Sequence, residues 1–469
     1  MSSPSLSCSR KIPSCTGVGT HPTLPSIRGR ITALKTRQPR VMPPETFFRM
    51  GYHHTGPMHR SFARGPLNGA GEMCDASDRP LLCLSLSKDE EELVVGSADH
   101  ALYAYNLKTC KPTRKLYSKA HGHIDWVTCV VHMDNGQVLS GGGDGKICVW
   151  PPSRLSPSTF PLKHNEDGAD GAYKRPACPN RLTHCQDLDG HASSVSKILP
   201  VPESDMAFSG SYDGLIKLWN LASKQALTFD AEGRSTKSNW SFGKNEIASD
   251  HSLSRCGTLD PVLDFAFDTE QKQLMSGTRK GNCKVWDLHT AKQIGTVRAA
   301  HRGPVTCLTR WSASIMVTGG QDGVVKVWDT RRGMPLVTQA VCCHVNPVQG
   351  TASAVSCLEK TGGLLATGGA DKRVCLLDPR RNFQTLHVFD HHQAPIYTLR
   401  YAISAESPVL FSGAGDGTVH CVNLLSNAVL YGLHPTRGPV RALATTTHLQ
   451  ADKKLVAAGE DGKVVIFRF

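Results

Sequence analysis

Histidine, serine or threonine, aspartate and tryptophan recur together three times along this 469-residue chain, at a fixed spacing. In each set the Ser or Thr precedes the Asp by four residues, and the Trp follows the Asp by six. The sets are His123, Ser140, Asp144 and Trp150; His191, Ser209, Asp213 and Trp219; and His301, Thr318, Asp322 and Trp328. A paired His and Asp can form the dyad of a general acid–base enzyme, so catalysis is the first chemistry to weigh.

The recurrence of the pair argues against catalysis. A His and Asp pair that returns in repeat after repeat is typical of a scaffold that satisfies buried polar groups, whereas an enzyme needs one site. The sequence also lacks a Walker loop, a dinucleotide fingerprint, a nucleophile elbow and a metalloprotease helix. We therefore predict that the protein is not an enzyme, and we assign no catalytic, cofactor-binding or metal-binding residue.

The three sets lie within a longer phrase that occurs eight times between residues 94 and 469. Each copy has two or three apolar residues, a cluster of Ser, Thr or Gly, usually an Asp, and then an alternating apolar run. This pattern predicts a β-hairpin with a tight turn, preceded in each repeat by a further strand. Most turns are about 45 residues apart, which matches the roughly 40 to 45 residues of a four-stranded propeller blade.

On these phrases the sequence resembles the WD-repeat β-propeller family, from about residue 80 to its last residue. In that family the four residue types form a hydrogen-bonded tetrad, which the resemblance implies for the three complete sets. The other repeats depart from the pattern, because Lys280 replaces the Asp of the fourth hairpin and no matching His precedes the first, fourth or sixth. The Trp is replaced at four positions, by Tyr105, Leu377, Val422 and Phe467.

The resemblance implies an all-β fold, and the eight hairpins predict a WD-repeat β-propeller of eight blades. Seven blades are the alternative if the first or fourth unit is not a full blade. We place the propeller at residues 57–469, after a disordered basic extension at residues 1–56. The last repeat lacks an outer strand, which in this family comes from before the first repeat, and we expect it within residues 57–66. Residues 151–187 and 222–261, rich in Pro, Gly, Ser and charge, are predicted to be surface loops.

The net charge of +13 belongs mainly to the N-terminal extension. Residues 1–70 contain ten Lys or Arg and one acid, which leaves a surplus of +4 over the other 399 residues. That surplus is too small to indicate a propeller that binds nucleic acid. Residues 1–44, with no acid and twelve Ser or Thr, fit an organellar transit peptide, a disordered or untranslated stretch before Met42, or a phosphate-binding arm.

The cysteine pattern and the apolar runs bound the compartment. The seventeen cysteines include no Cys-x-x-Cys pair, and Cys178, His184 and Cys185 match no standard zinc spacing, so buried free thiols in a reducing compartment are the better interpretation. No apolar run approaches the roughly 18 residues of a membrane span. We expect a cytoplasmic or nuclear protein, with organellar import as the alternative if residues 1–44 are a transit peptide.

Residues suited to protein binding fall on two faces of the predicted propeller. The loops before the first strands and the hairpin turns share one face, and they carry Trp126, Tyr212, Arg279 and Arg302. Trp, Tyr and Arg dominate the hot spots of protein interfaces. We therefore predict a non-catalytic scaffold or adaptor that presents loops to partner proteins, as a monomeric propeller within a larger complex.

The opposite face gives an alternative function. The run Trp328, Asp329, Thr330 and Arg331 resembles the Trp-Asp-x-Arg box of WD-repeat substrate receptors, which dock on the adaptor of cullin-RING ubiquitin ligases. Asp378 and Arg380 form a partial copy in the next blade, without the Trp. The alternative is therefore a substrate-recognition subunit of such a ligase, and a second alternative is a propeller that binds RNA or lipid phosphates.

Overall fold

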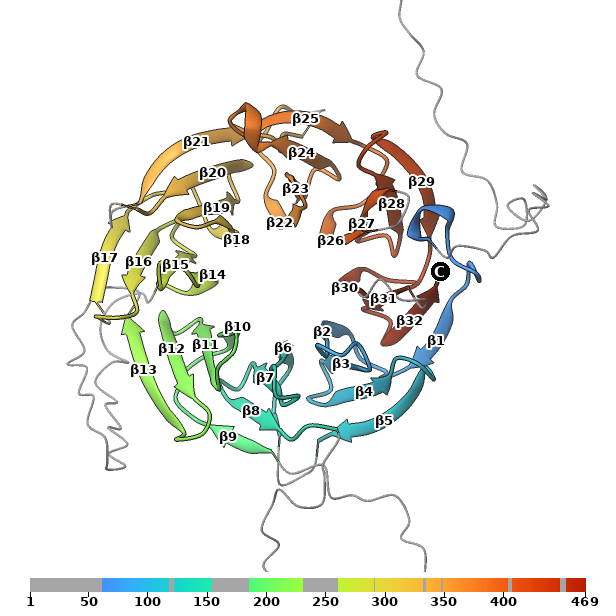
Figure 1. Cartoon of the computed structure of the whole chain (residues 1–469), viewed down its shortest axis with the longest axis horizontal. Helices are drawn as coiled ribbons and strands as arrows, with labels where there is room; N and C mark the ends of the chain where they lie inside the picture. The colour runs from blue at the N-terminus through green and yellow to red at the C-terminus, as the bar shows by residue number, and fades with distance from the viewer. Residues whose placement is uncertain are drawn as a thin grey trace, which may run out of the picture. The chain divides into compact units, whose positions relative to one another are not determined.

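The computed structural model describes residues 61–117, 122–153, 185–230, 260–290, 292–331, 335–346, 349–403, 407–447 and 453–469. Within these residues, eight four-stranded antiparallel sheets stand around a central axis like the blades of a propeller (Figure 1). The prediction of an eight-bladed β-propeller is confirmed, and the seven-bladed alternative is wrong. Residues 1–56, and most of the two predicted surface loops, lie outside the described residues.

The strands run outward from the axis in chain order, except in the last blade. Blade one contains β2 (Leu81–Leu86), β3 (Glu92–Ser97), β4 (Leu102–Asn106) and β5 (Lys111–Leu116). Blade two contains β6 (Val127–His132), β7 (Val138–Gly142), β8 (Ile147–Trp150) and β9 (Gln186–Leu188). Blade three contains β10 (Val195–Pro200), β11 (Met206–Ser211), β12 (Leu215–Asn220) and β13 (Gln225–Asp230). Blade four contains β14 (Val262–Asp268), β15 (Gln273–Thr278), β16 (Cys283–Asp287) and β17 (Lys292–Val297).

The second half of the ring repeats this arrangement. Blade five contains β18 (Val305–Ser312), β19 (Ile315–Gly320), β20 (Val324–Asp329) and β21 (Leu336–Cys342). Blade six contains β22 (Val355–Thr361), β23 (Leu364–Gly369), β24 (Val374–Asp378) and β25 (Gln384–Phe389). Blade seven contains β26 (Ile396–Ile403), β27 (Pro408–Ala414), β28 (Val419–Asn423) and β29 (Ala428–Leu433). Blade eight contains β30 (Val440–Thr445), β31 (Lys454–Gly459), β32 (Lys463–Arg468) and, as its outer strand, β1 (Glu72–Asp75).

The cores lie between adjacent blades, which explains the strand sequences. Each middle strand has a neighbouring blade on both faces, so β3 and β31 are buried along their whole length, whereas β5 on the rim is mostly exposed. Side chains of facing sheets interlock, as where Leu139 and Val195 pack in one cluster with Trp219 and join blades two and three. Apolar runs therefore mark inner strands, and outer strands carry a weak sequence signal.

The ring closes through β1, and the expectation that residues 57–66 supply this strand is wrong. β1 pairs antiparallel with β32, with Glu72 opposite Ile466 and Asp75 opposite Lys463. Its sequence, Glu-Met-Cys-Asp, alternates half-buried and exposed residues and offers no apolar run to find. Arg468 Nε holds it by an ion pair of 2.8 Å to Glu72 Oε1.

The segment that was expected to form the strand has another role. Phe62, in the 3-10 turn η2 (Phe62–Arg64), is fully buried in the core that blades seven and eight share. Its ring lies 4.8 Å from that of Phe469 and 5.5 Å from that of Phe411. Tyr431 donates its hydroxyl to the Phe62 carbonyl at 2.6 Å. The start of the described chain thus contributes an aromatic plug as well as a strand.

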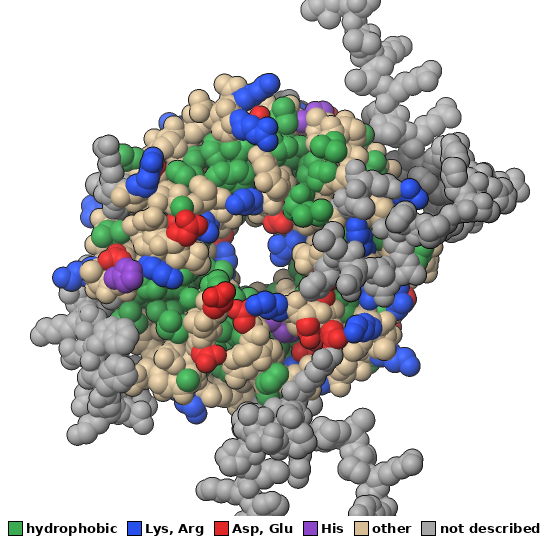
Figure 2. Space-filling model, viewed as in Figure 1, with side chains coloured by type: hydrophobic (Ala, Val, Ile, Leu, Met, Phe, Trp, Pro, Cys, Tyr) green, Lys and Arg blue, Asp and Glu red, His purple; other side chains and the backbone are tan. Residues whose placement is uncertain are grey.

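Hydroxyl groups tie several blades together beside the axis. Thr128 Oγ1, in the inner strand of blade two, donates to the carbonyl of Val195 in blade three at 2.6 Å. The hydroxyls of Thr306 and Ser356 make the equivalent bonds to the next blade. Figure 2 shows the channel that the inner strands surround, with acidic and basic side chains at its rim. Among the described residues, no helix is long and apolar enough to cross a lipid bilayer.

Candidate functional site

The three complete sets of predicted tetrad residues come together in blades two, three and five. In these blades the His Nδ1 lies 3.1, 2.9 and 3.0 Å from an Asp oxygen, and the His Nε2 lies 2.8, 2.7 and 2.7 Å from the Ser or Thr hydroxyl. The Trp indole N–H donates to the same hydroxyl at 2.9, 2.8 and 2.9 Å. The residues are His123, Ser140, Asp144, Trp150, His191, Ser209, Asp213, Trp219, His301, Thr318, Asp322 and Trp328.

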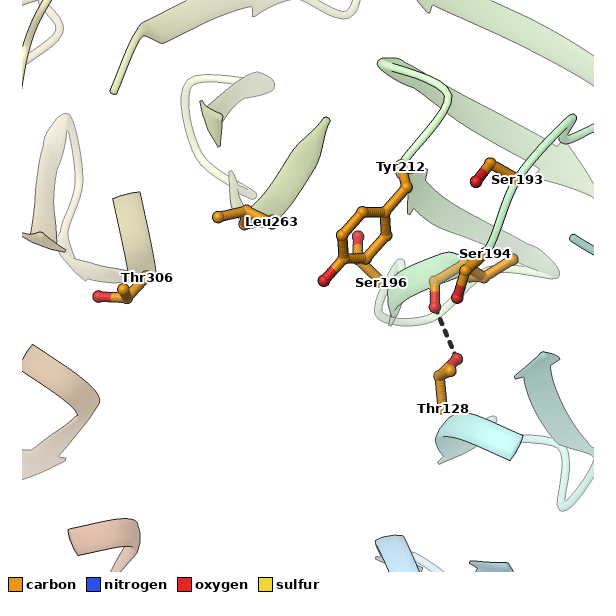
Figure 3. A pocket seen from close by; sticks show the side chains of 8 residues that line it. Thr128, Ser193, Ser194, Ser196, Tyr212, Leu263 and Thr306 are labelled. Atoms are coloured by element: carbon orange, nitrogen blue, oxygen red, sulfur yellow. Dashed lines mark hydrogen bonds between the residues drawn. The ribbon is translucent and has the colours of Figure 1, made fainter. Parts of the chain in front are cut away.

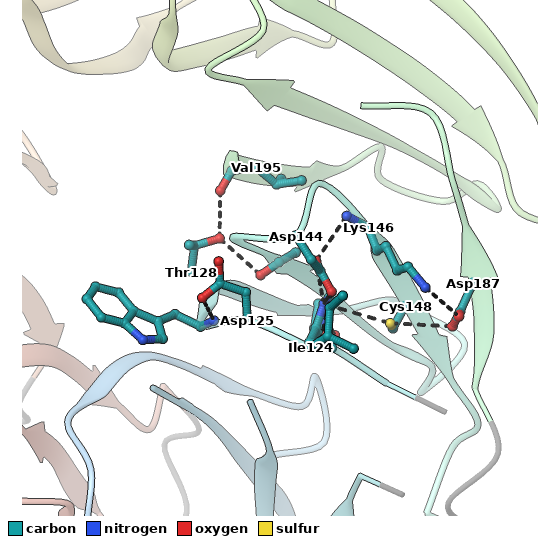
Figure 4. Close-up of polar contacts among 12 residues, drawn as sticks. Ile124, Asp125, Thr128, Asp144, Lys146, Cys148, Asp187 and Val195 are labelled. Carbon is teal, nitrogen blue, oxygen red and sulfur yellow. Dashed lines mark hydrogen bonds and ion pairs between the residues drawn. The ribbon is translucent and has the colours of Figure 1, made fainter. Parts of the chain in front are cut away.

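These networks have the properties of a scaffold. Burial alone would raise the pKa of Asp144, but hydrogen bonds from His123 and from the backbone N–H of Ile124 hold that pKa below its usual value. Figure 4 shows Asp144 placed between the backbone of Ile124 and that of Lys146. The hydroxyl of Ser140 is fully buried and engaged by both His123 and the indole. Each tetrad therefore ties an inner loop to the second and third strands of its blade.

Blade six contains a network that the sequence analysis missed, so the expectation of no matching His before the sixth hairpin is wrong. His344 Nδ1 lies 2.8 Å from Asp371 Oδ1, and its Nε2 lies 2.8 Å from Thr367 Oγ1. His344 precedes its Asp by 27 positions, against 21 in blade two, because the loop between them is longer. An isolated bridge between Val345 and Ala352 closes that loop. Only the spacing hid this His.

Blade four replaces the histidine by an acid. Asp260 accepts from Thr278 Oγ1 at 2.7 Å and from the side-chain amide of Asn282 at 2.8 Å. The backbone N–H of Lys280, the residue at the usual Asp position, donates to the same carboxylate at 2.8 Å. The carboxylate has thus moved from the turn to the inner loop, and the blade keeps its connection without His or turn Asp.

A second hydrogen bond fixes the upper face, defined here as the loops before the inner strands and the turns between second and third strands. In all eight blades, the residue before the turn Asp or Lys donates its N–H to the carbonyl that precedes the inner strand. The donors are Ala98, Gly143, Tyr212, Arg279, Gln321, Ala370, Gly415 and Glu460. The backbone at these positions is constant and the side chain is not.

The side chains predicted for partner binding are exposed on this upper face, in blades two to five. Trp126 is 58% exposed and Tyr212 is 40% exposed. Arg279 is exposed on the turn of blade four, and Arg302 is exposed on the inner loop of blade five. The N–H of Arg302 donates to Asp322 at 3.0 Å, so the tetrad itself fixes the backbone that carries this side chain.

A hollow of about 520 Å³ lies beside Tyr212. Its walls come from blades two to five, and Figure 3 shows Tyr212 extending into the space between Ser196 and Leu263. The hollow is lined by Thr128, Ser193, Ser194, Val195, Ser196, Tyr212, Leu263 and Thr306. Ser196 and Leu263 stand where Thr128 and Thr306 carry their blade-bridging hydroxyls; Leu263 has no hydroxyl, and that of Ser196 is buried without a partner among the described residues. The hollow thus offers hydroxyls next to the exposed ring of Tyr212.

The lower face carries the two predicted Asp-x-Arg boxes, in the turns that follow the third strands of blades five and six. Arg331 is 71% exposed and its Nε lies 2.9 Å from an Asp329 oxygen. Asp378 caps the 3-10 turn η5 (Pro379–Arg381) by accepting from the N–H of Arg380 at 3.0 Å, and Arg380 is exposed.

Trp328 is the exception among the residues proposed to meet a partner. It is fully buried and its indole N–H is bonded to Thr318, so it cannot contact another protein directly. The box can present only the side chains that follow it.

Aromatic packing joins the two boxed blades on this lower face. Trp311, at the end of β18, stacks edge to face on Phe383, which follows η5, with ring centroids 5.7 Å apart. Lys360 lies 5.2 Å above the Trp311 ring. In Figure 2, hydrophobic side chains gather over blades five and six, with basic side chains beside them. The surface around the boxes is therefore both apolar and basic.

All the cysteines that the structure describes are free thiols, and only Cys342 among them is exposed. Cys178 and His184 lie outside the described residues, but Cys185 does not stand alone. Its thiol lies 3.0 Å from Asp187 Oδ1, and that carboxylate also lies 3.6 Å from the thiol of Cys148 (Figure 4). Lys146 pairs with Asp187 at 3.6 Å and neutralises this group.

The family described as "WD domain, G-beta repeat" matches the chain at residues 111–151, 182–220, 291–329 and 383–423. Each match begins before the outer strand of one blade, or within it, and runs through the third strand of the next. The chain is a WD-repeat β-propeller. The offset between repeat and blade is what leaves the last blade without its own outer strand, so that β1 must supply it.

Two curated relatives and one solved structure show what this WD-repeat propeller is similar to. It is 25% identical over 242 residues to a ribosome biogenesis protein WDR12 homolog of Oryza sativa subsp. japonica, over 45% of this chain and 55% of the relative. It is 28% identical over 193 residues to cell division cycle 20.4, cofactor of APC complex, of Arabidopsis thaliana, over 39% of this chain and 42% of the relative. The chain thus spans about half the length of these relatives.

The solved structure is Chaetomium thermophilum Sqt1 bound to the N-terminus of the ribosomal protein L10. It matches with a TM-score of 0.62 and 14% identity, over 86% of this chain and 100% of that one. At that identity the likeness shows the fold alone.

Proposed function

We propose that this propeller is a non-catalytic scaffold that binds partner proteins on its upper face. The observation that carries the proposal is the repeated hydrogen-bonded frame of that face, which holds different side chains at equivalent positions of each blade. A rigid backbone with variable exposed side chains loses little entropy on binding, which favours affinity. Trp126 and Tyr212 supply aromatic anchors and Arg279 and Arg302 supply charge, as in interface hot spots.

The chemistry of the face suggests an extended segment with acidic and apolar residues as its ligand. The exposed residues follow one another over blades two to five beside the hydroxyl-lined hollow. The names of the relatives describe a protein of ribosome biogenesis and a cofactor of a complex. These likenesses support protein binding in general, and the partner of this chain is to be found by experiment.

Affinity purification of the full chain with mass spectrometry tests the proposal. We expect the double variant Trp126→Ala and Tyr212→Ala to lose its main partners by at least about tenfold, since aromatic hot spots each contribute about 2 kcal/mol or more. Leu425→Ala is the matched control, because Leu425 is 71% exposed on the lower face. Identical partner sets for wild type, double variant and control would contradict the proposal.

The lower face supports a second candidate function, that of a substrate-recognition subunit of a cullin-RING ubiquitin ligase. The observation in its favour is that two Asp-x-Arg boxes in consecutive blades project exposed arginines on the same face. The same purification with Arg331→Ala and Arg380→Ala should lose the cullin adaptor, while Arg437→Ala on the upper face should retain it. If the wild-type sample contains no cullin adaptor, this candidate is rejected.

A further inference from the structure

Three histidines of blade seven meet around one point, although they come from two separate segments. His391 and His392 lie in the loop between β25 and β26, and His420 lies on β28. One ring nitrogen of each lies within 4.8 Å of one ring nitrogen of the other two. The three ring centroids are 4.5 to 4.6 Å apart. The propeller fold alone does not require such a cluster.

One of the three is the tetrad histidine of its blade, released from its usual acid. In blades two, three, five and six, the equivalent Nδ1 lies 2.8 to 3.1 Å from an Asp oxygen. In blade seven, Asp416 is exposed and accepts from Thr418 Oγ1 at 2.6 Å instead. His392 keeps only its hydroxyl partner, with Nε2 2.6 Å from Ser412 Oγ. Its Nδ1 lies 3.4 Å from Thr418 Oγ1, the same hydroxyl that binds Asp416.

The neighbouring imidazoles have buried nitrogen atoms without partners. Among the described residues, both nitrogens of His391 and the Nδ1 of His420 are inaccessible to solvent and make no hydrogen bond. Buried polar atoms of this kind are rare and call for a partner. Gly432 faces His420 across the sheet, and a Cβ at that position would lie 3.2 Å from Nδ1. The absence of a side chain there leaves room beside that buried nitrogen.

The electrostatics of the cluster favour a cation bound to neutral imidazoles. Burial lowers the pKa of His391 to about 4, and burial with repulsion from neighbouring imidazoles lowers the pKa of His420 to about 4 and that of His392 to about 2. The nearest charges are acidic, with Asp390 acting on His391 and Asp416 on His420. A neutral imidazole offers a lone pair, and the Ser412 contact to Nε2 orients the ring of His392, as outer partners of metal ligands do.

We propose that His391, His392 and His420 bind one Zn²⁺ ion, which secures blade seven where the contacts to aspartate and tryptophan are missing. Imidazole suits zinc, and three histidines with a fourth position for water form a recognised zinc coordination set. Tetrahedral zinc holds its nitrogen ligands about 3.3 Å apart, so small rotations of the three rings suffice. The bound ion would join the loop before β26 to β28, the connection that the tetrad makes in blade five.

The test is a zinc titration of the purified, chelator-treated full chain in competition with a chromogenic indicator. We expect the wild type to bind one more equivalent of zinc than the double variant His391→Gln and His420→Gln. His289→Gln, an exposed histidine in blade four, is the matched control and should bind as the wild type does. The group of Cys148, Cys185 and Asp187 is intact in all three proteins, so the difference reports the histidines alone. Equal stoichiometry in wild type and double variant overturns the proposal.

A second measurement on the wild type does not depend on the folding of the variant. Cu²⁺ with ascorbate oxidises side chains next to the bound metal, and peptide mass spectrometry locates them. We expect oxidation at His391, His392 and His420, and protection of these residues by excess Zn²⁺. Oxidation that is confined to other histidines, or that zinc does not reduce, overturns the proposal.

Discussion

Blades five and seven hold a histidine at the same place in the fold, but the two imidazoles have different partners. His301 bonds to both Asp322 and Thr318, and Trp328 completes the network. In blade seven, His392 keeps a hydroxyl partner and lacks the other two. Blade six lies between these cases, because Leu377 replaces its Trp and Asp371 still bonds to His344. In blade six the His therefore keeps its Asp contact although the Trp is replaced. In blade seven that contact is lost where Thr418 binds the Asp.

The tetrad is thus a set of separable contacts. The hydroxyl contact is common to both blades, and it orients the imidazole through Nε2. The contact at Nδ1 varies, and with it the pKa of the histidine and what it can bind. A repeat can change this one contact while its four strands stay in register.

The largest expected effect comes from giving blade five the smaller residue of blade seven. Trp328→Val should lower the free energy of unfolding by about 3 to 4 kcal/mol, since it leaves a cavity and removes the hydrogen bond to Thr318. Urea unfolding followed by fluorescence measures the loss. Val422→Ala in blade seven is the counterpart and should cost less, because it removes fewer buried atoms. Equal losses would show that the two positions are not distinguished by packing.

The next largest difference in stability between blades five and seven should come from removal of the aspartate in the hairpin turn. Asp322→Ala leaves a nitrogen of buried His301 without its partner and should cost about 2 kcal/mol. Asp416→Ala removes an exposed carboxylate that does not contact His392, and we expect a change within about 0.5 kcal/mol. Urea midpoints of the two variants, measured at neutral pH, check this. A cost at Asp416 as large as that at Asp322 would contradict the assigned contacts.

Acid should weaken blade five in two steps. Burial lowers the pKa of His301 below 6.5, so its contribution to stability is present above about pH 6.5 and is lost as pH falls through the folded value. Burial would raise the pKa of Asp322, but bonds from Arg302 N–H and His301 lower it, so its contribution is lost below about pH 4. The free energy of unfolding in urea, measured over a range of pH, should fall less steeply below about pH 6.5 in His301→Asn. In Asp322→Asn it should fall less steeply below about pH 4.

The exposed His289→Asn should keep the slopes of the wild type in this series. Slopes that are unchanged in all three variants would contradict the assigned shifts.

A small effect on stability is also expected for Thr418→Val, which removes the group that holds Asp416. We expect a change of at most about 1 kcal/mol, since one part-buried hydrogen bond is lost. Asp416 could then reach His392 Nδ1, so zinc affinity should fall severalfold. Titration as described above measures this, with Thr445→Val in blade eight as the control. An unchanged affinity would mean that Thr418 does not keep His392 available.

The repeats made most of the fold predictable. The hairpin phrases identify the second and third strands of every blade, because these strands are buried on both faces and their apolar residues cannot vary freely. The tetrads of blades two, three and five followed from spacing alone, since four residues at fixed offsets leave one geometry. The eight-bladed count followed from the same phrases.

Three features could not be predicted, each for a physical reason. β1 has four residues and one side of it faces solvent, so it needs no apolar pattern. His344 lies beyond a lengthened loop, and spacing rules do not extend across insertions. The histidine cluster joins residues 391 and 392 to residue 420 through the sheet, and only the folded chain places them together. Both missed histidine features depend on contacts between strands, which composition does not record.

The closing of the ring by β1 has a consequence for how the protein is made. Glu72 and Arg468, which pair across the closing blade, are 396 positions apart. On a ribosome β1 emerges early and must wait, unpaired, until β32 has been synthesised. During that time blade eight does not exist, β1 is unpaired and the apolar face of blade one that packs on blade eight is uncovered, which favours association with other nascent chains. We expect biosynthesis rather than equilibrium stability to be the vulnerable stage of this protein, and chaperones that shield strand edges and apolar surface to be engaged until β32 has been synthesised.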